Sequence, residues 1–163
     1  MMNARTFYKT VQNKLHWPIT GHTAAEIVAE RANADKPNMG LTSWKNAPKG
    51  KIARTDVTIA KNYLSEPELD ELNRIVNMYL DYAENQAKRR IAMTMKDWID
   101  RLDGFLQFNE YAVLKDGGRI SNEIAKKLAE HQFEQYRIFQ DREYLSDFDQ
   151  TIQRLENKKP EQG

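Results

Sequence analysis

Apolar residues along this chain recur every three or four positions, the spacing that places side chains on one face of an α-helix. The same periodicity predicts long amphipathic helices at 68–89, 95–114 and 121–158, with a bend or a second helix around 145–147, where the spacing is irregular. No segment alternates apolar and polar residues as a half-buried strand does. The pattern therefore predicts an all-α fold. Its clearest stripe comprises Leu69, Leu72, Val76, Leu80, Ala83 and Ala87.

Local signals at the ends of the apolar segments predict where helices begin and end. Pro18 and Gly21 are expected to end a first helix that covers residues 4–15. The run Thr23-Ala-Ala-Glu26 matches a capping box, in which the threonine oxygen accepts a backbone N–H and the glutamate side chain reaches back. Ser65-Glu-Pro-Glu68 matches a second one.

Length and composition fit one helical domain with a buried core. Of 163 residues, 40% are hydrophobic and 30% are charged, so we expect six or seven helices in one domain over residues 1–158 and a flexible tail at 159–163. The absence of cysteine excludes disulfides, thiolate nucleophiles and cysteine-ligated metals. A net charge of +1 gives no overall field that would gather nucleic acid. Lacking a long apolar run and a signal peptide, the chain is expected to be cytoplasmic and free of the membrane.

The first candidate site lies in the stretch WPITGHTAAEIVAER. His22, Glu26 and Glu30 are four residues apart, and this spacing can place a base beside a carboxylate that orients it, or offer ligands to a divalent metal. The competing interpretation, which we favour, is that Glu26 completes the capping box and Glu30 lies on a solvated surface. His22 and Glu26 are therefore the catalytic candidates. No metal or cofactor is predicted, because the histidines have no metal-ligand spacing and phosphate-loop and dinucleotide motifs are absent.

The second candidate site is a basic segment between residues 34 and 54, which proline and glycine make irregular. Cations beside an aromatic ring can contact phosphate and stack on a base, so the segment is a candidate nucleic-acid or substrate contact. The competing interpretation, again the favoured one, is that these cations are solvated. The candidate contact residues are Trp44, Lys45, Lys49, Lys51 and Arg54.

Aromatic residues at helical spacing in the second half of the chain are interpreted as core. If the last members of this set prove exposed, they would mark a surface for self-association or for a protein partner. The set comprises Tyr79, Tyr82, Trp98, Phe105, Phe108, Tyr111, Phe133, Tyr136 and Phe139.

Several longer runs together resemble the C-terminal half of the RhuM family of bacterial virulence-associated proteins. The resemblance spans residues 4–139 and is carried by FYKTVQNKLHW, ITGHTAAEIVAERA, KPNMGLTSWKN, SEPELDELNRIVNMYLDYAENQA and MTMKDWIDRLDGFLQFNEYAVL. It implies a DNA-associated protein whose nucleic-acid contacts belong to a separate N-terminal region that these residues do not include. It implies no catalytic residues. GHTAAE and KPNMGLTSWKN are typical of the family, and they draw attention to His22, Lys36, Asn38, Thr42 and Trp44.

Two functions of different kinds follow from these observations. The first is a non-enzymatic helical effector or oligomerisation module of a DNA-associated regulator from a mobile or defence locus, which would bind its own copies or a protein partner. The alternative is a toxin- or defence-type enzyme, a nuclease or a nucleotide-modifying enzyme, built around His22 and Glu26 with the Trp44 segment as a clamp. A weaker third option is direct nucleic-acid binding by residues 45–54. The directions of the His22 and Glu26 side chains discriminate between the first two.

Overall fold

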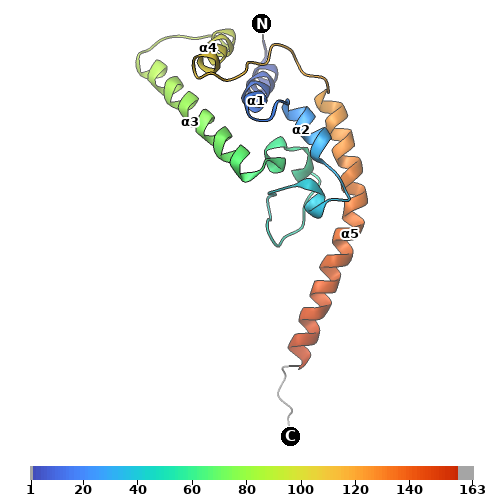
Figure 1. The fold of residues 1–163 in the computed structure, drawn as a ribbon. Coiled ribbons are helices and arrows are strands. Elements are labelled where there is room, and N and C mark those ends of the chain that lie inside the picture. Colours follow the sequence, from blue (N-terminus) through green and yellow to red (C-terminus); the bar gives the residue numbers. More distant parts are fainter. Residues whose placement is uncertain (1, 158–163) are drawn as a thin grey trace.

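The computed structural model describes residues 2–157, apart from the side chains of residues 146 and 147, and this part of the chain contains helices and no strand (Figure 1). The all-α prediction is confirmed. In place of six or seven helices, the described residues form five α-helices and three short 3₁₀ turns. The α-helices are α1 (Ala4–Thr20), α2 (Ala24–Arg31), α3 (Glu66–Lys88), α4 (Met95–Phe108) and α5 (Asn122–Asn157), and the turns are η1 (Pro37–Gly40), η2 (Asp56–Thr58) and η3 (Ala60–Tyr63). The predicted tail, 159–163, lies outside the described residues.

The first helix is longer than predicted. α1 continues to Thr20, with Pro18 inside it, rather than ending near residue 15. Pro18 has no N–H to donate to the carbonyl of Lys14, so this turn lacks one backbone hydrogen bond. In the same turn the Thr20 hydroxyl donates to the carbonyl of His16 at 3.0 Å. Gly21 ends the helix in the left-handed conformation, φ 72°, and its N–H donates to the carbonyl of Trp17.

The later helices also depart from their predicted bounds. α4 ends at Phe108 rather than at residue 114, because the Asn109 side chain donates to the carbonyl of Phe105 at 2.8 Å and Glu110 adopts a φ of 63°. α5 continues as one helix through 145–147, so the second helix considered there does not form. None of the described helices combines the length and the apolar content needed to cross a membrane.

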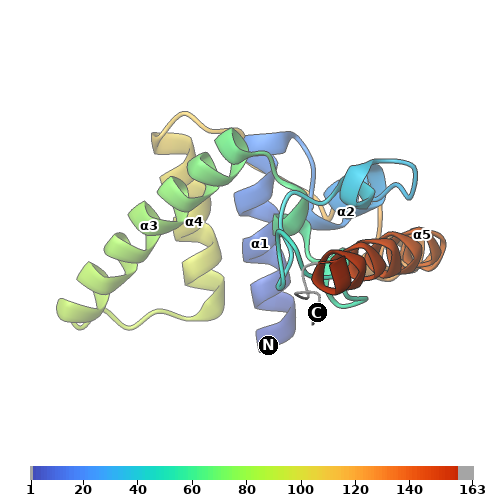
Figure 2. The same cartoon turned by 90° about the horizontal axis from the view of Figure 1, so that it is seen from below.

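The helices form two groups that meet along α1. α3 and α4 pack against α1 on one side, and α2 packs against both α1 and α5 on the other (Figure 2). A small core of Ile75, Leu102 and Leu106 holds the first group together. The larger core lies where α2, the 3₁₀ turns and the first half of α5 meet. Its most deeply buried side chains include Ile27, Met39, Val57, Tyr63 and Leu64.

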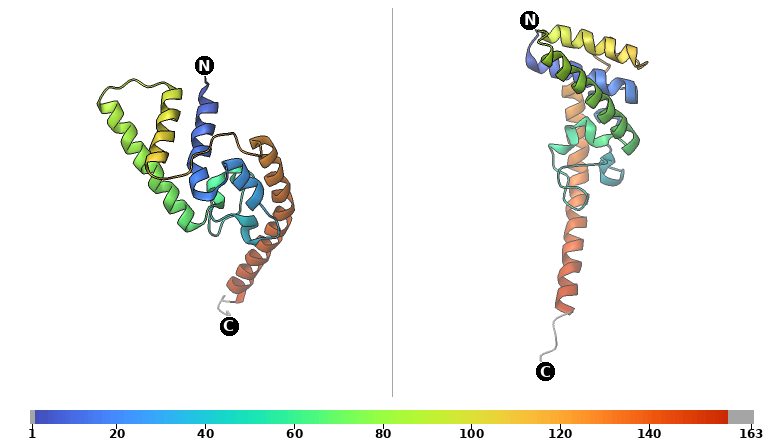
Figure 3. Two further views of the ribbon diagram at one scale, coloured as in Figure 1. Left: turned by 45° about the horizontal axis from the view of Figure 1, so that its top comes forward. Right: turned by 90° about the vertical axis from the view of Figure 1, so that its left-hand side faces the viewer.

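The second half of α5 extends beyond the rest of the protein (Figures 1 and 3). Residues of its first half, including Phe133 and Tyr136, are buried against the larger core. From residue 142 to residue 157, every position whose side chain is described is exposed. This projecting segment therefore contributes little to the core of its own chain.

Candidate functional site

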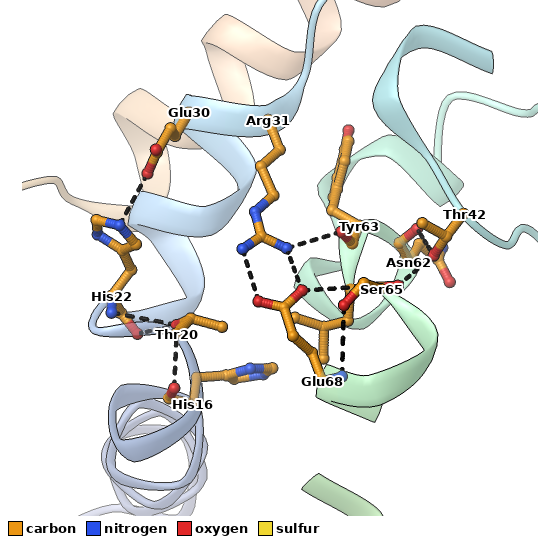
Figure 4. Close-up of polar contacts among 11 residues, drawn as sticks. His16, Thr20, His22, Glu30, Arg31, Thr42, Asn62, Tyr63, Ser65 and Glu68 are labelled. Atoms are coloured by element: carbon orange, nitrogen blue, oxygen red, sulfur yellow. Dashed lines mark hydrogen bonds and ion pairs between the residues drawn. The ribbon is translucent and has the colours of Figure 1, made fainter. Parts of the chain in front are cut away.

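The three polar residues at the start of α2 do share one face. The Nδ1 atom of His22 lies 3.6 Å from Oε2 of Glu26, and its Nε2 atom lies 3.0 Å from Oε2 of Glu30 (the second pair is drawn in Figure 4). Both ring nitrogens of His22 thus face carboxylates. The helical spacing predicted this arrangement correctly.

Glu26 does not complete the predicted capping box. The Thr23 hydroxyl oxygen accepts the N–H of Glu26 at 3.3 Å, as expected of an N-cap. The Glu26 side chain does not accept the N–H of Thr23, and its Oε1 atom instead accepts the N–H of Arg119 at 3.1 Å. The interpretation of Glu26 as a capping-box partner was therefore wrong, because a loop distant in sequence satisfies this carboxylate instead.

The loop before α5 packs closely on the start of α2 at Gly118. This glycine has a φ of 81°, and a Cβ atom added to it would lie 2.5 Å from Cγ2 of Thr23 and 2.6 Å from Oε1 of Glu26. Only glycine fits both the backbone conformation and the space. The close approach brings the N–H of Arg119 within reach of Glu26.

A cavity of about 620 Å³ lies between the start of α2, this loop and α5. Its charged side chains are mostly acidic, and Arg119 is the one cation among the residues that line it. Within the part of the chain that the structure describes, no three histidine or acidic side chains are arranged to hold a metal ion. The cavity can shelter a water or a polar group beside His22. Its lining includes Trp17, His22, Glu26, Glu30, Arg119 and Leu128.

The structure separates Trp44 from the His22 cavity. The Trp44 side chain is 8% exposed, and its indole N–H donates to the carbonyl of Gly50 at 2.8 Å. It belongs to the larger core, and no residue of the segment 44–54 lines the cavity. The two predicted sites therefore do not combine into one, and Trp44 offers little ring surface for a base to stack on.

Two of the four predicted cations hold the basic segment against α5. Lys51 pairs with Asp141 at 3.0 Å, and Arg54 lies 3.3 Å from Glu130 and 3.9 Å from Glu134. The acidic partners on α5 reduce the attraction that these cations could exert on phosphate. The remaining two candidates, Lys45 and Lys49, are exposed.

The other residues of the family-typical run are spread over different places. The Thr42 hydroxyl, which Figure 4 shows beside Asn62, donates to the carbonyl of Leu64 at 2.6 Å and so ties this run to the residue that follows η3. Lys36 and Asn38 line a separate surface pocket of about 680 Å³. None of these three residues lines the His22 cavity.

His16 is a buried histidine in α1. Burial lowers its pKa to about 4, and the negative charge of Glu68 acts against this shift. Its Nδ1 atom has no hydrogen-bond partner in the described structure. This histidine is therefore neutral at pH 7.

The aromatic set is divided between core and surface. Tyr79, Trp98 and Phe105 pack edge to face between α3 and α4. The core interpretation was wrong for Phe108, which is 87% exposed, and for Phe139, which is 56% exposed. From Ile138 onward, further large apolar residues of α5 face solvent. Five of them form what we call the distal apolar face, namely Ile138, Leu145, Phe148, Ile152 and Leu155.

Comparison with known proteins agrees with the resemblance seen in the sequence. The family model for the virulence protein RhuM family matches residues 1–145. No curated protein and no solved structure matches the chain. Since the family model covers most of the 163 residues, the chain belongs to the virulence protein RhuM family.

Proposed function

We propose that this chain is a non-enzymatic helical module that associates with protein chains through the distal apolar face of α5. We place it in a DNA-associated regulator of a mobile or defence locus, a setting that rests on the family resemblance alone. The distal apolar face lies on α5, and its residues are not those that line the cavity at the start of α2. Association through this face therefore requires no catalytic group.

The exposure of the distal apolar face carries the proposal. Its five side chains are between 38% and 62% exposed, although each is a large apolar residue on one projecting helix. Contiguous apolar surface of this kind marks an interaction site more often than a free surface. A helical segment without tertiary contacts is also marginally stable in water, and packing against a partner would stabilise it.

The enzyme alternative keeps one supporting observation, the cavity beside His22 and Glu26. Both ring nitrogens of His22 already face carboxylates, and Glu26 is held by the backbone of Arg119. We therefore rank a toxin- or defence-type enzyme second. Nucleic-acid binding by residues 45–54 ranks third, and an affinity for DNA that falls steeply with rising ionic strength would favour it.

The proposal is tested by measuring the average mass of the chain in solution by light scattering over a range of protein concentrations. The variant carrying Leu145→Gln and Phe148→Gln should associate far less than the wild type, because it lacks two apolar anchors at the centre of the face. Phe108→Gln is the control, since it removes an even more exposed aromatic ring at the end of α4. A wild-type chain that stays monomeric at high concentration, and that binds no protein encoded beside it, would contradict the proposal.

A further inference from the structure

The distal apolar face has the spacing of a coiled coil. Ile138, Leu145 and Ile152 are seven residues apart. Phe148 and Leu155 each follow one of these residues by three positions and are themselves seven apart. In heptad terms the first three occupy a positions and the other two occupy d positions. The only remaining d position between residues 138 and 155 is Asp141, which Lys51 neutralises at 3.0 Å.

This stripe lies away from the body of the protein. Ala129, Phe133 and Tyr136 of α5 are buried against the core, whereas Ile138 and Leu145 are more than half exposed. On a helix with 3.6 residues per turn, Leu145 is turned about 180° from Tyr136. A second helix can therefore lie along the stripe without displacing the core.

We propose that the occupant of this face is α5 of a second copy of the chain, packed in the antiparallel direction. The inference rests on the proposed function and names the partner that it left open. In an antiparallel pair, a positions face d positions, so Leu145 of one copy packs on Phe148 of the other. The same register places Ile138 opposite Leu155, which fills both ends of the paired segment.

Charges beside the stripe favour the antiparallel direction over the parallel one. An antiparallel pair brings Arg142 of one copy close to Asp149 of the other, twice by symmetry, because both occupy e positions. A parallel pair would instead bring Arg137 close to Arg142 of the second copy and would stack Asp141 on Asp141. Like charges at such positions oppose pairing.

The paired segment, residues 138–155, is about 27 Å long at the rise of an α-helix. An interface of this length lies at the small end of those that form specific complexes, so we expect a reversible dimer with a micromolar dissociation constant. Dimer formation should therefore depend strongly on protein concentration.

The first experiment measures the dimer dissociation constant of the full chain by sedimentation equilibrium. Arg142→Glu should weaken the dimer by about 5- to 30-fold, because it places two acidic pairs across the interface. Adding Asp149→Lys to this variant should restore the wild-type constant. In a parallel dimer the same Arg142→Glu change would strengthen pairing, through attraction to Arg137 of the second copy. A strengthened or unchanged dimer would overturn the antiparallel inference.

The second experiment uses the absence of cysteine in the wild-type chain. When Ile138→Cys and Leu155→Cys variants are mixed under mild oxidation, an antiparallel dimer gives the mixed disulfide. The two identical positions would lie about 25 Å apart, too far for either variant to link to itself. Disulfides between identical variants would indicate a parallel dimer and overturn the inference.

The two proposals can fail separately. Dimers that form but fail the charge or disulfide tests leave association through α5 intact and exclude the antiparallel pair. A wild-type chain that never pairs with itself overturns the inference about the second copy. The proposed function then depends on whether a different protein binds the distal face and loses affinity on Leu145→Gln and Phe148→Gln substitution.

Discussion

Arg31, at the end of α2, forms a two-pronged ion pair with Glu68, in the first turn of α3, with N···O distances of 2.7 and 2.8 Å (Figure 4). Arg31 also donates to the carbonyl of Tyr63 at 3.0 Å, and Glu68 accepts the N–H of Ser65 at 2.9 Å. These contacts join α2, η3 and α3 at one point. The hydrogen bonds from Arg31, followed by those from Ser65, lower the pKa of Glu68 to about 2.

Breaking this pair should destabilise the fold more than breaking a surface pair. Arg31→Met is expected to lower the free energy of unfolding by about 2 kcal/mol, since Glu68 would keep its charge in a partly buried place without a partner. Lys88→Met is the matched control. It removes an exposed pair with Glu84 at 3.5 Å and should cost less than about 0.5 kcal/mol. Urea unfolding at pH 7 measures both, and equal costs would contradict the role given to Arg31.

His16 should make stability depend on pH between 4 and 6.5. Its folded pKa of about 4 lies below the ordinary histidine value of 6.5, so the unfolded chain binds the proton more readily. The stabilisation is therefore complete above pH 6.5 and is lost as the pH falls toward 4. Between pH 7 and pH 5, the wild type should lose about 2 kcal/mol more than His16→Leu does. Urea unfolding at the two pH values measures this difference, and parallel losses would show that His16 is not buried in its neutral form.

Gly118→Ala should weaken the docking of the loop before α5. The new methyl group would collide with Thr23 and Glu26, and the positive φ adds strain, so we expect a loss of about 1–3 kcal/mol in the free energy of unfolding. Gly117→Ala is the control, because a Cβ atom there meets nothing within 4 Å. Thermal unfolding compares the two variants. A Gly118→Ala variant as stable as the control would mean that the loop does not pack on α2 as described.

His22→Ala separates the two leading functions. The histidine is partly exposed, its shorter contact is with the exposed Glu30, and the buried Glu26 keeps its hydrogen bond from Arg119, so the variant should remain folded and lose less than about 1 kcal/mol of stability. Under the association proposal it should also keep any phenotype that expression of the wild-type chain is found to confer in cells. Circular dichroism checks the fold. Loss of the phenotype in a folded variant would instead favour the enzyme.

Local features of this fold were predictable from sequence, and the capping boxes illustrate why. Ser65 and Glu68 form the reciprocal hydrogen bonds of the predicted motif, because every group involved lies within four residues. The same motif failed at Thr23 and Glu26. There the carboxylate accepts the N–H of Arg119, 93 positions away, and no local sequence pattern predicts a hydrogen bond over that separation.

The candidate sites were predictable to a similar degree. Helical spacing correctly grouped His22 with Glu26 and Glu30, yet it gave no sign that Arg119 and the 116–120 loop would form the other wall of the cavity. Composition made the segment around Trp44 a candidate contact for a nucleic acid or a substrate. Tertiary packing instead buries the indole and uses Lys51 and Arg54 to hold α5. The exposure of the second half of α5 was not predicted, because apolar residues at helical spacing indicate core when the positions of the neighbouring helices are unknown.

The central claim is that the distal half of α5 is an association surface, and hydrogen exchange of its backbone amides at several protein concentrations tests it most directly. Amides between residues 145 and 155 should exchange quickly in dilute solution, because every position of that segment whose side chain is described is exposed. We predict that their protection rises with protein concentration while the amides of α1 to α4 stay unchanged. Protection of the distal segment that is the same at every concentration, with no protein partner added, would contradict self-association through α5.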